Sequence, residues 1–224
     1  VPKKKVKTSP RNVAITTLPG FKVDKIYDIP GKTQGSWVGL TSDDKGRLIA
    51  CDQYGGIYRL TPGKKPLQIE KLNVKVGGAH GVLYAFNSLY VFTSKEGLFR
   101  LQDSNDDDQF DKEKQLMSFK GKGEHGVHSM VLSPDKKSIY LISGNTTDLP
   151  KSVTRQRMAR AWSEDHLLPR MNDGRGHNKG RLAPGGHIIK ISPDAKEQEL
   201  IAHGFRNQFD AAFNANGELF TYDA

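Results

Sequence analysis

The segment "GRLIACDQYGGIYRL" (residues 46–60) recurs 41 residues later as "NSLYVFTSKEGLFRL" (87–101), with the same pattern of apolar strands and polar turns. Within each copy a second strand begins nine residues after the first, as a β-hairpin requires. A third copy is divided between "KSIYLISGN" (137–145) and "GGHIIKI" (185–191), and a fourth opens at "NGELFTYDA" (216–224). Repeats of about 40 to 50 residues made of short strands are typical of a β-propeller. The sequence therefore predicts an all-β fold.

The turns "SDDKG", "SPDKK" and "NANG" introduce the first strand of each pair, which we expect in the middle of a blade. The strands "GIYRL", "GLFRL" and "HIIKI" should follow in a more external position. This count gives about three and a half blades, whereas a closed propeller needs about four to eight. We therefore expect an incomplete, N-terminal portion of a longer propeller.

Two segments depart from the repeat. Residues 1–36 are expected to form a basic N-terminal arm and a first strand, before a partial propeller over 37–224. The third hairpin carries an insertion at 146–186, in which "SVTRQRMARAWSEDHLL" (152–168) contains helix formers. The insertion is predicted to be a partly helical loop over one face, and long ordered loops on a rigid scaffold often line binding sites.

Composition excludes several classes of protein. The net charge is +9, but apart from "KKKVK" (3–7) the lysines are dispersed, so we expect no nucleic-acid partner. No run of 18 apolar residues is present, so no membrane span is expected in this chain. The single cysteine, Cys51, excludes an internal disulfide, a zinc ribbon and a Cys-X-X-Cys-His haem attachment site within these residues.

The stretch "GKGEHGVHSMVLSPD" (121–135) holds two histidines three residues apart. As metal ligands they would suit a helix, but "SMVLSPD" indicates a strand, on which an odd spacing points the side chains to opposite faces. His125 could instead act as a general base, with Glu124 beside it, because a neutral imidazole accepts a proton near neutral pH. The alternative is a histidine that only caps turn carbonyls. His128 is expected to be a structural or supporting residue.

The stretch "HGFRNQFDAAFNANGELFTYD" (203–223) places Arg206 and Asn207 before a new inner strand, as Glu124 and His125 stand one blade earlier. Equivalent positions of successive blades converge on the central channel of a propeller. Arg206 offers a bidentate fork for a carboxylate or quinone oxygen, and Asn207 offers both a donor and an acceptor. The alternative is an arginine bound to the carbonyl groups of a neighbouring blade.

The acidic stretch "DSNDDDQFD" (103–111) follows part of the spacing of a calcium-binding loop. Positions 6 and 12 depart from that pattern, since Asp108 replaces glycine and Lys114 replaces glutamate, which predicts weak affinity. A solvated acidic turn is the other interpretation. The candidate ligands, at positions 1, 3, 5 and 9, are Asp103, Asn105, Asp107 and Asp111.

Taken together, "GEHGVHSMVLSPDKKSIYLISGN", "APGGHIIKI" and "HGFRNQFDAAFNANGELFTYDA" resemble the soluble glucose/sorbosone dehydrogenase family. The likeness is greatest to its large bacterial multidomain branch of membrane-bound dehydrogenases, which often carry a downstream c-type haem domain. It covers about Val38 to Ala224. The resemblance implies a six-bladed propeller that uses pyrroloquinoline quinone (PQQ) and calcium.

The resemblance also implies roles for individual residues. His125 stands where the family has its catalytic base, with Glu124 at its acidic neighbour, and Arg206 with Asn207 matches a pair that contacts the quinone. In "GGAHGVLYAF" (77–86), His80 stands near the place of a cofactor-contacting glutamine, although this loop matches only loosely. The calcium site of the family would begin at Asp223. Further lysine and arginine cofactor ligands would lie beyond Ala224, so this chain would hold at most half of a cofactor site.

The resemblance thus predicts a periplasmic or extracellular quinoprotein that oxidises a sugar or alcohol by base-assisted hydride transfer. A c-type cytochrome or a fused haem domain would accept the electrons. The rival hypothesis is a non-catalytic propeller that binds a polysaccharide or a protein partner through the same face.

Overall fold

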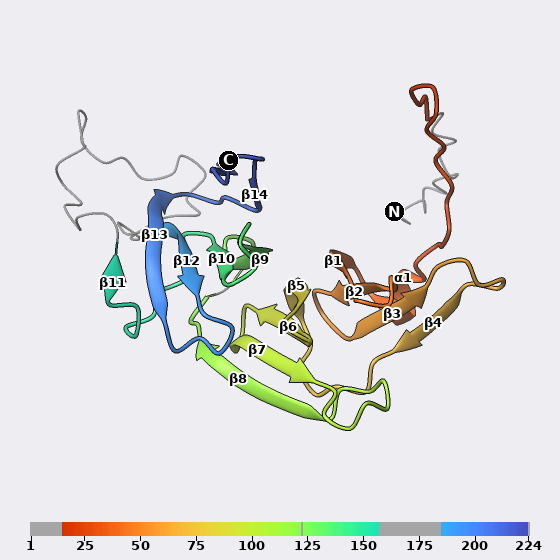
Figure 1. Ribbon diagram of the computed structural model, residues 1–224, viewed down its shortest axis with the longest axis horizontal. Helices are drawn as coiled ribbons and strands as arrows, with labels where there is room; N and C mark the ends of the chain where they lie inside the picture. The colour runs from red at the N-terminus through yellow and green to blue at the C-terminus, as the bar shows by residue number, and fades with distance from the viewer. Residues whose placement is uncertain (1–14, 122, 157–184, 224) are drawn as a thin grey trace, which may run out of the picture.

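The computed structural model describes residues 15–121, 123–156 and 185–223, and these residues form four antiparallel sheets with one helical turn (Figure 1). The helical turn is α1 (Gly31–Gln34). The first sheet has the order β1 (Trp37–Ser42), β2 (Leu48–Asp52), β3 (Ile57–Thr61), β4 (Gln68–Lys71). The second has the order β5 (Ala79–Ala85), β6 (Ser88–Thr93), β7 (Gly97–Gln102), β8 (Lys112–Ser118).

The third sheet repeats this meander with β9 (Val127–Leu132), β10 (Ile139–Ser143), β12 (Gly186–Ile191) and β13 (Gln198–Phe205). A two-residue strand, β11 (Arg155–Gln156), pairs parallel to β13 at its outer edge. The fourth sheet is the single hairpin β14 (Ala211–Phe213) and β15 (Leu219–Thr221). Three full blades and the opening of a fourth are thus present in the described residues, as the repeat predicts, with β2, β6 and β10 as second strands and β3, β7 and β12 as third strands.

The first strands of the blades lie on the inside of the arrangement. β1 contacts β5, β5 contacts β9, and β9 contacts β14, whereas β4 and β8 are edge strands. The four sheets follow one another along an open arc and do not close into a ring (Figure 1). The fold is that of part of a β-propeller, as predicted.

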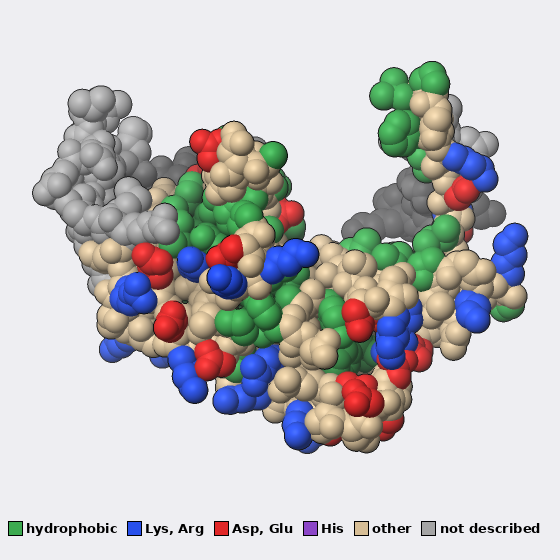
Figure 2. All heavy atoms as spheres, viewed as in Figure 1, with side chains coloured by type: hydrophobic (Ala, Val, Ile, Leu, Met, Phe, Trp, Pro, Cys, Tyr) green, Lys and Arg blue, Asp and Glu red, His purple; other side chains and the backbone are tan. Residues whose placement is uncertain are grey.

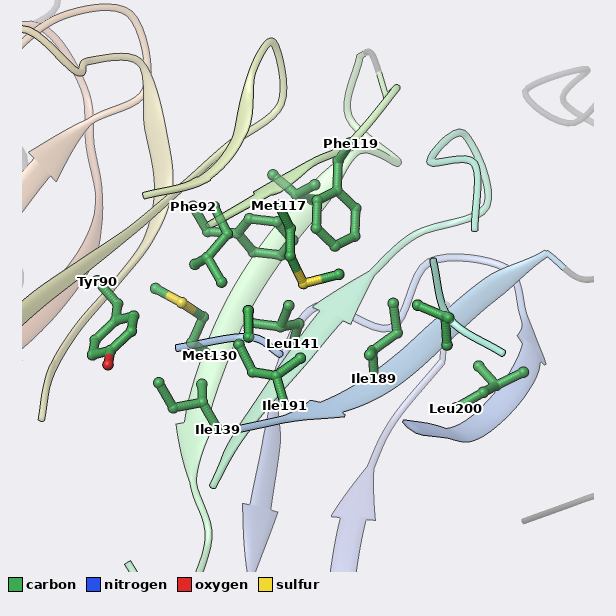
Figure 3. Packing of buried hydrophobic residues seen from close by; sticks show 14 of the residues in the cluster. Tyr90, Phe92, Met117, Phe119, Met130, Ile139, Leu141, Ile189, Ile191 and Leu200 are labelled. Atoms are coloured by element: carbon green, nitrogen blue, oxygen red, sulfur yellow. The ribbon is translucent and has the colours of Figure 1, made fainter. Parts of the chain in front are cut away.

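Three apolar clusters lie between successive blades and hold the arc together. Strands of the first two blades share one cluster, which includes Ile49, Ile57 and Val91, and the third and fourth blades share another around Ile142 and Ile188. Figure 3 shows the largest cluster, in which side chains of the second and third blades interdigitate. Burial of these side chains, at roughly 25 cal/mol per Å² of apolar surface, is the main force that joins the sheets.

Glycines let the inner strands approach closely. A Cβ atom on Gly39 of β1 would lie 3.0 Å from the carbonyl oxygen of His80, and one on Gly81 of β5 would lie 2.6 Å from that of His128. His80 and His128 therefore occupy equivalent places on successive inner strands. Both stand at register shifts, where a β-bulge leaves one residue unpaired and can re-aim its side chain.

The N-terminal segment and the insertion depart from the blade pattern. Residues 15–36 contain α1 and no strand, and the first strand among the described residues begins at Trp37. Residues 1–14 of the expected N-terminal arm lie outside the described residues, so the arm and strand expected over 1–36 stay a prediction. In the insertion, the described residues 152–156 form a turn and β11 where helix was predicted, and Val153 is buried in the core. The rest of the predicted helical stretch lies outside the described residues. None of the helices in the described part has the length and apolar character to cross a membrane.

Candidate functional site

A cavity of about 580 Å³ lies at one end of the first two blades, which we call the cavity end. Its walls come from the connections β2–β3, β4–β5, β6–β7 and β8–β9. Backbone contributes much of the lining, because glycines recur around it, and the side chains include an aromatic ring and charges of both signs. These side chains are Tyr54, His80, Lys95, Glu96 and Glu124. The sequence-predicted residues His80 and Glu124 therefore line one cavity.

His125 follows Glu124 directly and turns away from solvent, with an exposed fraction of 3%. Its Nδ1 lies 2.9 Å from Oδ1 of Asn145, which follows β10. With the amide oxygen toward the ring, Nδ1 carries the proton and Nε2 carries the lone pair. The backbone is fixed as well, because Thr146 N–H donates to the His125 carbonyl oxygen at 3.1 Å. The side-chain and backbone hydrogen bonds thus fix the orientation of the ring and, with the amide oxygen toward it, its tautomer.

His128 lies on β9 with an exposed fraction of 1% and contacts a different amide. Its Nε2 lies 2.7 Å from Oδ1 of Asn207, and its ring packs against Phe209 with centroids 4.6 Å apart. Burial lowers the pKa of His128 to about 4; the hydrogen bond to Asn207 opposes this shift, and the nearby imidazoles of His80 and His125 add to it. His128 is therefore neutral at physiological pH.

The Arg206–Asn207 segment is held in place by its backbone. Oδ2 of Asp223 accepts the Arg206 N–H at 2.8 Å and Oδ1 accepts the Asn207 N–H at 2.7 Å. The Arg206 carbonyl in turn accepts the N–H of Asn145 at 2.9 Å. One hydrogen-bonded network thus joins His125, through Asn145, to the Arg206–Asn207 pair of the next blade and to Asp223.

Asp223 has an internal counterpart in the first blade. Asp52 stands four residues after the start of β2, as Asp223 stands four residues after the start of β15. Oδ1 of Asp52 accepts the N–H groups of Ser36 at 2.9 Å and Tyr54 at 3.1 Å. Both carboxylates therefore cap backbone donors at the cavity end of their blades. The calcium role that the resemblance gives to Asp223 stays a prediction.

The acidic loop 103–111 lies elsewhere. It follows β7, whose six residues span about 20 Å from the cavity end. Asp103 accepts the N–H groups of Asp107 at 3.2 Å and Asp108 at 2.8 Å, and Asp111 accepts the Ser104 N–H at 2.6 Å. In the described part of the chain no group of three His, Cys, Asp or Glu side chains could hold a metal ion. The carboxylates of the predicted calcium loop thus cap their own backbone, and calcium binding there stays a prediction.

Asp108 docks this loop onto the first blade, which the sequence pattern alone does not reveal. Its carboxylate bonds to the guanidinium of Arg47, to Arg59 Nη1 at 3.3 Å and to Lys45 Nζ at 2.8 Å. The hydrogen bonds from Arg47 hold the pKa of the Asp108 carboxyl well below its usual range. We call this region, with the β1–β2 turn, the turn end. Asp108 links the first two blades there.

Two residues of the cavity end were missed by sequence reasoning. In the sequence Asn145 is only the last residue of a predicted strand, and its contact with His125 depends on the loop that follows β10. Gln208 is fully buried, and its Nε2–H₂ donates to the carbonyl oxygens of Ser143 at 2.9 Å and His187 at 3.2 Å. It ties the start of the fourth blade to the third. The only signal for Gln208 in the sequence is its position directly after the Arg206–Asn207 motif.

No known protein-family model and no curated protein matches the sequence. Solved structures do match the fold. The chain is similar to a carbohydrate-active enzyme of family AA12 from Trichoderma reesei, with a TM-score of 0.56 at 14% identity over 84% of this chain and 45% of that one. It is also similar to the PQQ domain of pyranose dehydrogenase from Coprinopsis cinerea in its holo form, with a TM-score of 0.55 at 13% identity over 83% of this chain and 42% of that one.

The chain therefore spans less than half the length of these neighbours. At this level of identity the likeness establishes the propeller fold and leaves the activity to be argued from the residues.

Proposed function

We propose that the chain forms part of a quinoprotein dehydrogenase that oxidises a hydroxyl group of a sugar or alcohol. The observation that carries the proposal is the buried pair His125–Asn145, in which Oδ1 of the amide lies 2.9 Å from Nδ1 and fixes the imidazole. His125 is not itself a lining residue of the cavity, but it directly follows Glu124, which is. General-base catalysis needs an imidazole fixed within reach of the substrate. The fold shared with a PQQ domain supports the choice of cofactor class.

The cavity has room for a small planar ligand, and its lining holds one lysine, Lys95, with two carboxylates, Glu96 and Glu124. Its volume of about 580 Å³ is within the range of pockets for small ligands. Five glycines at its rim leave backbone exposed to a planar ring, and Lys95 supplies a positive charge for a carboxylate. The buried Nδ1 of His128 has no hydrogen-bond partner in the described residues, and such an unpaired atom calls for an explanation, which a bound ligand or water would supply.

Each residue then has a task. When bound, PQQ supplies the ortho-quinone group that takes up the hydride from the substrate carbon. Nε2 of His125 accepts the proton of the substrate hydroxyl, and Asn145 keeps the ring in the required tautomer. The side chains of Arg206 and Asn207 would donate hydrogen bonds to cofactor oxygens. Glu124 and His80, which line the cavity, would contact substrate or cofactor.

The proposal extends to the surroundings of the enzyme. Calcium would bind from Asp223 onward, electrons would pass to a c-type cytochrome or a fused haem domain, and the protein would act outside the cytoplasm, in the periplasm or beyond the cell. These assignments follow the family resemblance and the similarity in fold to the PQQ domain of pyranose dehydrogenase. By that resemblance, the described residues would hold only part of such a site.

A dye-linked dehydrogenase assay tests the proposal on the full polypeptide that contains this chain, loaded with PQQ and calcium. We expect oxidation of sugars or alcohols by the wild type and a loss of about 10²- to 10⁴-fold in kcat for His125→Ala, since this is the usual worth of a general base. His203→Ala removes a half-buried histidine of β13 and is the matched control. Equal activity of wild type and His125→Ala contradicts the assignment, and binding of a polysaccharide without PQQ-dependent turnover favours a non-catalytic propeller.

A further inference from the structure

The contact between His128 and Asn207 joins two blades through one buried hydrogen bond. His128 lies on β9 of the third blade, and Asn207 precedes β14 of the fourth. The two atoms that bond, Nε2 and Oδ1, are 2.7 Å apart. Phe209 packs on the imidazole, and Gly144 leaves room for the amide, because a Cβ atom there would lie 2.7 Å from Oδ1 of Asn207. The pair is therefore sterically confined.

The surroundings of Nδ1, the other ring nitrogen of His128, decide which of the two nitrogens carries the proton. Nδ1 of His128 is buried and has no hydrogen-bond partner in the described residues. If Nδ1 carried the proton, a buried N–H donor would be unsatisfied, which is rarer and more costly than an unsatisfied acceptor. Nε2 therefore carries the proton and donates it to Oδ1. The amide of Asn207 cannot flip without placing its N–H₂ group against this N–H.

We propose that His128 is a positioning residue that fixes the amide of Asn207 by its oxygen, so that only the Nδ2–H₂ group is left to bind a ligand. The oxygen of Asn207 is used by His128, whereas its nitrogen makes no hydrogen bond within the described residues. Only donors then remain for a ligand. The position therefore recognises a hydrogen-bond acceptor, such as a quinone or carboxylate oxygen, and rejects a cation. The identity of that ligand rests on the proposed function, but the locked amide does not.

The first test needs no ligand and no variant. A long-range ¹H–¹⁵N spectrum of the imidazole nitrogens at neutral pH distinguishes a protonated from an unprotonated nitrogen. We expect His128 to be neutral, with the proton on Nε2 and a bare Nδ1. A proton on Nδ1, or rapid exchange between the two tautomers, overturns the proposal.

The second test measures the affinity of the full polypeptide for PQQ by fluorescence titration. His128→Phe keeps the ring on Phe209 but loses the N–H, so the amide is free to flip, and we expect affinity for PQQ to fall about tenfold, as the loss of one hydrogen bond predicts. His128→Gln retains an N–H donor and should recover part of the loss. His203→Phe, at a half-buried histidine of β13, is the matched control and should bind as the wild type does.

The two tests separate this inference from the proposed function. If the wild type does not bind PQQ but the Nε2–H tautomer is found, the proposed function fails and the locked amide stands. If PQQ binds with equal affinity to wild type and His128→Phe, His128 does not position Asn207 for the cofactor. The proposal is then overturned, although the proposed function is unaffected.

Discussion

The two ends of the blades satisfy their polar groups in opposite ways. At the turn end, Asp108 is bonded to Lys45, Arg47 and Arg59, and the carboxylates of the acidic loop cap their own backbone. Figure 2 shows acidic and basic side chains interspersed over the blades. At the cavity end, buried polar atoms without a hydrogen-bond partner recur among the described residues: Ser94 Oγ, His128 Nδ1, Ser143 Oγ, Thr147 Oγ1, His187 Nε2 and Gln208 Oε1. Toward the turn end there are fewer such atoms among the described residues, including Arg100 Nε and Gln198 Oε1.

This difference indicates which end of the blades is structural and which end is the candidate for ligand binding. Buried polar groups that find each other stabilise a fold, whereas buried groups left unpaired cost free energy and persist where a ligand uses them. In the sequence the acidic loop follows part of a metal-binding spacing, with departures at Asp108 and Lys114 that predict weak affinity. The contacts show that the carboxylates of the acidic loop are well paired, and the proposed function assigns the ligand to the histidine-rich end.

The largest expected effect is a difference between the two ends in the pH range over which each loses its contribution to the free energy of unfolding. His128 and His187 have pKa values lowered from 6.5 to about 4, in both cases chiefly by burial. The unfolded chain therefore binds more protons than the folded chain between these values, so stability falls as pH falls from 6.5 to 4. The loss is on the order of 3 kcal/mol for each imidazole once pH is below 4. Urea unfolding across this window measures it.

The turn end should respond in a lower window. The pKa of Asp108 lies below its usual value of 3.8, so its contribution is present above pH 3.8 and is lost only as pH falls further. The variant His187→Phe should flatten the slope between pH 6.5 and 4, and Asp108→Asn should leave that slope unchanged. A wild-type stability that is constant from pH 6.5 to 4 contradicts the assignment of two buried neutral histidines.

The second prediction breaks the turn end directly. Asp108→Asn leaves the guanidinium of Arg59, whose side chain is only 5% exposed, without its charge partner on the second blade. We expect a loss of about 2 kcal/mol in unfolding free energy, below the full cost of breaking a buried pair because Asp108 is 37% exposed. Asp107→Asn, in the same loop but without an arginine partner, is the control. Equal destabilisation by both variants would show that loop shape, rather than the ion pairs, holds the blades.

The sequence predicts the propeller well and the site only in part. The repeat locates the strands because each blade must place apolar residues at the same steps to bury them against its neighbours. The same regularity brings Arg206 and Asn207 near His125. Contacts through Asn145, Asp108 and Gln208 depend on loops whose paths no periodicity records, so they were found only in the structure. The predicted helical part of the insertion lies largely outside the described residues.

The third prediction concerns Asn145, which sets the tautomer of His125. Asn145→Ala removes the 2.9 Å contact and lets the ring protonate at either nitrogen. We expect kcat for the proposed dehydrogenase reaction to fall about tenfold, the worth of one hydrogen bond, with PQQ affinity unchanged. Asn214→Ala, the same change in the β14–β15 turn, should leave kcat unaltered. If Asn145→Ala weakens cofactor binding and leaves kcat intact, Asn145 supports the cofactor rather than the base.

The smallest expected effect separates Asp223 from its counterpart Asp52. Both carboxylates cap two backbone N–H groups, so either change to Asn should cost stability whether or not calcium is present. Only a metal ligand should also change the response to calcium. In the full polypeptide we expect millimolar calcium to stabilise the wild type by about 1 kcal/mol, as a weak extracellular site would. This gain should persist in Asp52→Asn and disappear in Asp223→Asn. If thermal unfolding shows the same calcium response in both variants, Asp223 is a backbone cap like Asp52, and the predicted calcium site does not begin there.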